Sequence, residues 1–160
     1  MSLHLKSTGI DFADFGHGSG SMSSELMDDY EEGSWTPSMK GGTTDGSSSS
    51  QAGTGRYTKV GNLCHIQLEM SNKTLSGESG NLKFSGLPFT AGSSGGVEAH
   101  AAGMMHNFAW SSDTLPALYV AVSDTYLGGI QAVNGSPWST WAVTNTSALY
   151  FRMGIVYGTS

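Results

Sequence analysis

Residues 63–70 read Leu-Cys-His-Ile-Gln-Leu-Glu-Met, so apolar and polar side chains alternate along this segment. Successive side chains of a β-strand point to opposite faces, and a period of two therefore predicts a half-buried strand. Its buried face would carry four residues: Cys64, Ile66, Leu68 and Met70. Gly61 and Asn62, just before it, tolerate positive φ and predict a turn from a strand at 56–60. The pattern favours a fold built from sheets that bury one face.

Short apolar or alternating runs recur along the rest of the chain, separated by Gly, Ser and Asn. They predict further strands at 81–85, 97–109, 115–122, 126–133, 138–143 and 148–156. Gly, Ser and Thr together make up 62 of the 160 residues, which suits many short strands and turns rather than a helical bundle. We expect an all-β fold, a β-sandwich or jelly-roll-like head domain. One exception is expected, a short helical turn that Ser24 caps and Gly33 ends.

The formal charge is concentrated near the N-terminus. Residues 1–32 carry seven acids and one lysine, whereas residues 33–160 carry six acids and six Lys or Arg. The larger part is therefore neutral and has no basic stripe, which argues against binding to nucleic-acid phosphates. Residues 16–21 read Gly-His-Gly-Ser-Gly-Ser, which is typical of a linker. We expect a flexible lead at 1–24 and the head domain at 25–160.

Motifs for catalysis, phosphate binding and dinucleotide binding are absent from the sequence, which predicts a protein that is not an enzyme. Cys64 is the only cysteine, and its place on an apolar face predicts a buried, inert thiol. The adjacent acids at 28–29 and 31–32 lack the alternating oxygen pattern of a calcium loop.

The five histidines have no spacing typical of metal ligands, so neither a metal nor a cofactor is expected. One alternative stays open, in which His100 or His106 from three chains meets around a three-fold axis and binds a metal. The chain has no apolar run of about 18 residues, so membrane insertion is not expected either.

Three tryptophans lie among small polar residues: Trp110, Trp138 and Trp141. The flat ring of Trp stacks on the C–H face of a sugar, and neighbouring Ser, Thr and Asn side chains hydrogen-bond its hydroxyl groups. These three residues are therefore candidate ligand-binding residues, and the neutral charge favours an uncharged ligand. The alternative is that the rings fill the core or a subunit interface.

Four motifs follow one another in the first 90 residues. They read Gly-Ile-Asp-Phe at 9–12, Glu-Leu-Met-Asp-Asp-Tyr-Glu-Glu-Gly-Ser-Trp-Thr-Pro at 25–37, Gly-Arg-Tyr-Thr-Lys-Val-Gly-Asn at 55–62 and Gly-Leu-Pro-Phe at 86–89. With them the chain resembles the C-terminal domain of bacteriophage tail-fibre and related virion proteins, of a type found in aquatic or uncultured viruses. Residues 91–160 carry no motif of this family.

The resemblance implies a trimeric, β-rich tip of a virion tail fibre, made in the host cytoplasm, that binds a glycan or protein of the host cell surface. The lead would join a shaft. Whether the chain is part of a longer fibre stays open. The small number of Leu, Ile, Val and Phe residues, 29 in all, also favours a homotrimer, because three chains can bury apolar surface between them.

Two alternatives remain. One is a purely structural, trimerising virion domain that binds no receptor. The other is a glycan-degrading enzyme. It is less favoured, because fibres that degrade glycans usually contain long β-helical repeats, and this sequence has none.

Overall fold

The computed structural model describes residues 4–6, 9–11, 26–27, 29–46, 51–92, 99–101, 103–109 and 114–159. These residues form β-strands and the loops between them, with no α-helix among them. Every strand pair is antiparallel. The predicted all-β fold is confirmed. No helix in the described part of the chain has the length and apolar character needed to cross a membrane.

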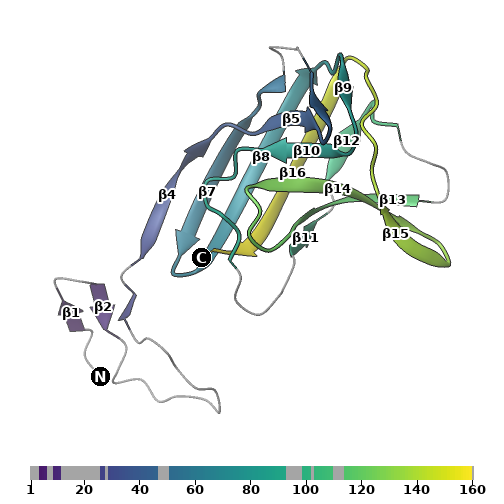
Figure 1. The fold of residues 1–160 in the computed structure, drawn as a ribbon. Coiled ribbons are helices and arrows are strands. Elements are labelled where there is room, and N and C mark those ends of the chain that lie inside the picture. The colour runs from purple at the N-terminus through teal and green to yellow at the C-terminus, as the bar shows by residue number, and fades with distance from the viewer. Residues whose placement is uncertain are drawn as a thin grey trace.

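The first large sheet has five strands in the order β12, β16, β8, β7 and β4 (Figure 1). Their bounds are Met104–His106, Leu149–Gly158, Leu63–Lys73, Thr54–Val60 and Tyr30–Trp35. Strand β8 contains the alternating segment that predicted it, and its buried residues alternate with exposed ones from Leu63 to Met70. The turn before it is also as predicted, because Gly61 has a φ of 57°.

The second large sheet is built from β11, β13, β14, β10 and β5 in that order, and β15 pairs with β14 beside this path. Their bounds are Ala99–Ala101, Thr114–Val120, Tyr126–Val133, Leu82–Ser85 and Ser38–Gly41, with β15 at Ser136–Thr140. The predicted strands at 81–85, 115–122 and 126–133 therefore lie side by side in one sheet.

Two smaller sheets complete the fold. Strand β6 (Thr44–Asp45) pairs with β9 (Glu78–Ser79), and β2 (Gly9–Asp11) lies between β1 (His4–Lys6) and β3 (Leu26–Met27). Because β3 follows residue 24 and pairs with β2, the pairing crosses the predicted boundary between lead and head domain. The division at residue 24 stays a prediction.

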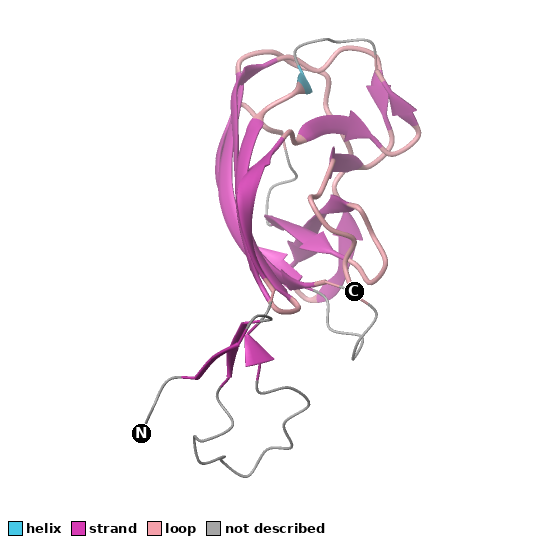
Figure 2. Cartoon of the chain, turned by 90° about the vertical axis from the view of Figure 1, so that its left-hand side faces the viewer, coloured by secondary structure: helices cyan, strands magenta, loops and turns pink. Residues whose placement is uncertain are grey.

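The two large sheets share one hydrophobic core. Figure 2 shows the long strands as a curved layer with further strands beside it. Phe84 of β10 and Phe151 of β16 lie on facing sides, and their rings stack with centroids 4.9 Å apart. Both side chains are fully buried, as are Met39 and Met70. Five buried residues alternate along β16 and line one side of this core: Leu149, Phe151, Met153, Ile155 and Tyr157.

The predicted helical turn between Ser24 and Gly33 is wrong, because residues 30–35 form strand β4. Tyr30 pairs with Val60 and Trp35 with Gly55, so β4 completes the edge of the first sheet. Trp35 is buried, and a Cβ atom on Gly55 would lie only 2.2 Å from its Nε1 atom. Burial of this ring over a glycine outweighs the weak helix-start pattern of the acidic residues.

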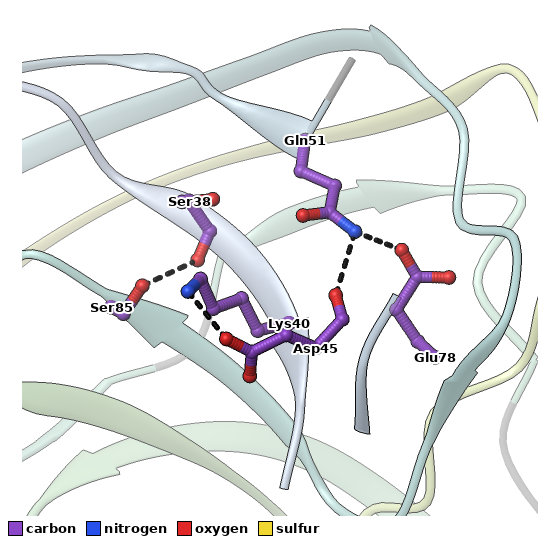
Figure 3. Close-up of polar contacts among 6 residues, drawn as sticks. All are labelled: Ser38, Lys40, Asp45, Gln51, Glu78 and Ser85. Carbon is purple, nitrogen blue, oxygen red and sulfur yellow. Dashed lines mark hydrogen bonds and ion pairs between the residues drawn. The ribbon is translucent and has the colours of Figure 1, made fainter. Parts of the chain in front are cut away.

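Hydrogen bonds of Gln51 connect the loop between β6 and β7 to strand β9 (Figure 3). The Nε2 atom of Gln51 donates to the backbone oxygen of Asp45 at 2.9 Å and also to Glu78 Oε1. Glu78 is almost fully buried, and its backbone N–H donates to Asn145 Oδ1 at 3.2 Å. Since buried polar groups need partners, this cluster holds the loop beside the second sheet.

Candidate functional site

A hollow of about 230 Å³ lies on the outer face of the second large sheet. Inward-pointing Leu118, Leu127 and Phe84 belong to the core, so their neighbours along each strand point outward. The strand register places Tyr119 opposite Gly128, and Gly128 opposite Lys83, in one row across β13, β14 and β10. The described residues lining the hollow are Gly42, Thr43, Gly80, Asn81, Leu82, Lys83, Tyr119, Tyr126, Gly128, Gly129 and Thr140.

Gly128 allows the ring of Tyr119 to lie against strand β14. A Cβ atom on Gly128 would come within 2.5 Å of Tyr119 Cε1, so any larger residue would displace this ring. The absence of a side chain lets another group approach the backbone closely, which is a recurrent use of glycine inside a strand.

Trp138 extends this aromatic surface from strand β15. Its side chain is 59% exposed, and its ring centroid lies 6.1 Å from that of Tyr119, with the rings tilted by 48°. Thr140 pairs with Ile130, which places Thr140 and Trp138 on the outer face of the sheet. Ile130 lies on this face too, yet it is only 8% exposed and is not part of the core cluster. The outer face of the sheet therefore has a buried apolar residue, Ile130, that is separate from the hydrophobic core.

Tyr126 and Lys83 form the opposite part of the hollow. The Nζ atom of Lys83 lies 4.1 Å from the centroid of the Tyr126 ring, a cation–π contact. Burial raises the pKa of the Tyr126 hydroxyl, and the nearby Asp124 carboxylate raises this pKa further. Tyr126 is therefore a neutral aromatic side chain at physiological pH.

Neutral polar groups stand next to these rings. Thr43, Asn81 and Thr140 line the hollow and present hydroxyl and amide groups. Gly42 keeps the loop close, because a Cβ atom there would lie 3.2 Å from the backbone nitrogen of Asn81. Flat rings with hydrogen-bonding groups beside them can hold a small ligand that has an apolar face and several hydroxyl groups.

The structure places two of the three predicted tryptophans, and their environments differ. Trp138 lies beside the hollow, Trp110 lies outside the described residues, and Trp141 is 3% exposed and packs in the core. The indole nitrogen of Trp141 donates to the backbone oxygen of Ala109 at 2.9 Å. A ligand cannot stack on a ring buried in this way, so we leave Trp141 out of the candidate site.

Sequence reasoning missed Tyr119, Tyr126 and Lys83. A signal for all three existed, because each alternates with residues that the structure buries: Leu118 and Val120, Leu127, and Leu82 and Phe84. The alternation places the three side chains on solvent faces. It could not show that the three strands are neighbours.

The predicted inert thiol agrees with the environment of Cys64. The side chain is fully buried, and burial raises the pKa of the thiol. A raised pKa leaves less thiolate at neutral pH, and the thiolate is the reactive form. Tyr157 on the neighbouring strand is buried as well, which raises the pKa of its hydroxyl, and that hydroxyl donates to the backbone oxygen of Phe89 at 3.0 Å.

The histidines of the alternative metal site belong to different sheets. His100 pairs with Tyr119 in the second sheet, whereas His106 pairs with Tyr150 in the first and packs against its ring. Within the described ranges, no group of three or more His, Cys, Asp or Glu side chains is arranged to hold a metal ion. A site shared by three chains stays a prediction.

The outer face of the first sheet is a second, more open surface. Its groove of about 1280 Å³ is lined by polar and charged residues of β4, β7, β8 and β16, among them Arg56, His65 and Gln67. Arg152 and Glu69 pair across this face at 2.6 Å. At one end of the same face lie four exposed apolar side chains, here called the apolar corner: Tyr30, Val60, Leu63 and Val156.

Comparison with known proteins adds no assignment, because neither a protein-family model nor a curated protein matches this chain.

Proposed function

We propose that this chain is a non-enzymatic head domain of a virion fibre, and that it binds a glycan of the host cell surface in the hollow of the second sheet. The observation that carries the proposal is a pair of aromatic rings, Tyr119 and Tyr126, that line the hollow together with hydroxyl- and amide-bearing residues. The ring of Trp138 adjoins that of Tyr119. Such a surface matches the chemistry of a sugar, which has an apolar C–H face and polar edges.

The virion location rests on the motif resemblance in the first 90 residues, and the all-β fold is consistent with it. We assign the two large antiparallel sheets to a β-sandwich, because facing side chains of both sheets form one core. The protein would act at the tip of a tail fibre, with a host-surface receptor and its own copies as partners.

The homotrimer is the second part of the proposal. Support comes from the apolar corner, whose four side chains are between 41% and 58% exposed in the single chain. Contiguous exposed apolar side chains often mark protein–protein contacts. The corner includes Tyr30, the first residue of β4, so it lies where the chain enters the first sheet from the lead.

A glycan array tests the binding proposal when wild-type protein is compared with Trp138→Ala. We expect the substitution to weaken glycan binding by about 1–3 kcal/mol, the usual contribution of an anchoring aromatic residue. The melting temperature should stay close to that of wild type, because Trp138 is mostly exposed. Met104→Ala is the matched control, since it shortens an exposed apolar side chain on the other sheet, outside the apolar corner.

The purely structural alternative makes a different prediction for the same array. If a well-folded trimer binds no glycan, and if Trp138→Ala changes nothing, the head domain only trimerises and the hollow has no ligand. The apolar corner concerns trimerisation alone, so it supports this alternative and the glycan-binding trimer equally.

A further inference from the structure

Lys83 is the only charged side chain among the described residues that line the hollow. Strand β10 lies between β14 and β5, and Lys83 pairs with Gly128 on one side and with Lys40 on the other. Two lysines thus lie directly opposite each other on neighbouring strands, an arrangement that is unfavourable unless each charge finds a partner.

The two lysines have different partners. The Nζ atom of Lys40 pairs with Asp45 Oδ2 at 2.7 Å, so the charge of Lys40 is largely compensated (Figure 3). Lys83 instead lies over the ring of Tyr126 and has no carboxylate partner within the described part of the chain. Among the described residues, the lysine that lines the hollow is therefore the one without a carboxylate partner.

The contact with Tyr126 keeps Lys83 available to a ligand. An aromatic face attracts an ammonium group, but it provides no oxygen lone pair for the three N–H donors of lysine. The side chain passes close to Gly42, because a Cβ atom added there would lie 3.4 Å from Lys83 Cε. The carboxylate of Asp124 lies near the Tyr126 hydroxyl and does not line the hollow.

We propose that the glycan bound in this hollow carries a carboxylate, as uronic and sialic acids do, and that Lys83 selects it over the neutral sugar. This inference rests on the proposed function. One lysine compensates one negative charge, so a carboxylate fits better than a phosphate monoester, which carries about −1.5 to −2 charges at neutral pH. The rings of Tyr119 and Trp138 would hold the sugar ring while Lys83 pairs with its acidic group.

The experiment uses a glycan array of matched pairs that differ only in the acidic group. The pairs are glucuronides with glucosides, galacturonides with galactosides, and sialyllactose with its methyl ester, and sulfated and phosphorylated forms of the neutral sugars are included. At low salt we expect wild type to prefer a carboxylated member about fivefold or more, which corresponds to about 1 kcal/mol for a partly exposed charge pair. Moderate salt should reduce this preference, because salt screens the charges.

Two variants separate the role of Lys83 from general charge effects. Lys83→Gln should weaken binding of the acidic member until it equals binding of the neutral member, whereas Lys40→Gln should keep the preference. Melting curves of both variants confirm that the fold is intact.

The array distinguishes failure of the carboxylate proposal from failure of the glycan-binding proposal. Equal binding of acidic and neutral members, or a preference that survives in Lys83→Gln, overturns this inference and leaves the proposed function standing. A stronger preference for sulfate or phosphate also overturns it. Binding of no member of any pair contradicts both proposals.

Discussion

At the scale of single residues, Gly128 sets the shape of the hollow. Replacing it with alanine introduces a Cβ atom 2.5 Å from Tyr119 Cε1, so the tyrosine ring must swing away from strand β14. Because the ring can move into solvent, we expect a stability loss below about 2 kcal/mol. We expect a loss of glycan binding of about 1–3 kcal/mol, measured by a binding titration beside a thermal melt.

Gly158→Ala is the control for this variant. A Cβ atom on Gly158 meets its nearest neighbour only at 3.9 Å, so its stability and binding should match wild type. Unchanged binding in Gly128→Ala would show that the position of Tyr119 does not matter for the ligand.

The chemistry of Cys64 provides a second residue-scale prediction. Because the thiol is fully buried and its pKa is raised, the native protein should react slowly with a thiol reagent at neutral pH and faster as the pH increases. Reaction should become complete at once in denaturant. A stoichiometric, rapid reaction of the folded protein at neutral pH would contradict the buried position of Cys64.

At the scale of the strand elements, Glu78 links β9 to the loop that follows β6. Glu78→Ala removes one of the two acceptors of Gln51 Nε2 in a buried place and leaves only the backbone oxygen of Asp45. We expect a loss of about 1–3 kcal/mol in the free energy of unfolding, measured by denaturant titration. Glu69→Ala is the comparison, because its ion pair with Arg152 is exposed and should contribute less than about 1 kcal/mol. Similar losses in both variants would mean that the cluster around Glu78 has no special role.

Most strands could be predicted because the alternation of buried and exposed residues is a local property of the sequence. Strand β8, the turn at Gly61 and the strand at 81–85 are examples. Strand β4 was missed because its stability comes from pairing with β7 and from Trp35 lying over Gly55, contacts that no local pattern shows.

The candidate site was predictable only in part for the same reason. Trp138 could be selected from its polar neighbours, but the pairing of β13, β14 and β10 that brings it close to Tyr119 and Lys83 is a tertiary property. Trp141 has equally polar sequence neighbours and lies in the core, so composition alone cannot distinguish an exposed tryptophan from a buried one.

At the scale of the whole molecule, we predict that the head domain folds without the lead. We expect deletion of residues 1–24 to leave a cooperative thermal melt, because both large sheets are formed by residues from Tyr30 onward. Loss of the cooperative melt would place part of the lead within the fold. Deletion of residues 1–24 removes β1 and β2 but leaves β3, which pairs with β2. A protein that starts at residue 29 lacks all three strands of this small sheet and is the control.

The proposed trimer makes its own prediction. Light scattering at micromolar concentration should give three times the chain mass of 16.7 kDa. Changing the apolar corner with Leu63→Lys should lower this mass, because charge at a buried contact is unfavourable. Lysine at exposed position 115 of the second sheet, Leu115→Lys, should leave the mass unchanged. A monomer mass for wild type contradicts the trimer.

The most direct test of glycan binding by this head domain is a crystal structure with the glycan that ranks first on the array. We expect a sugar ring against Trp138 and Tyr119, with its polar groups toward Thr43, Asn81 and Lys83. A sugar in the groove of the first sheet, beside Arg56 and His65, would contradict the assignment of the hollow, and so would a structure in which the hollow stays empty at saturating glycan.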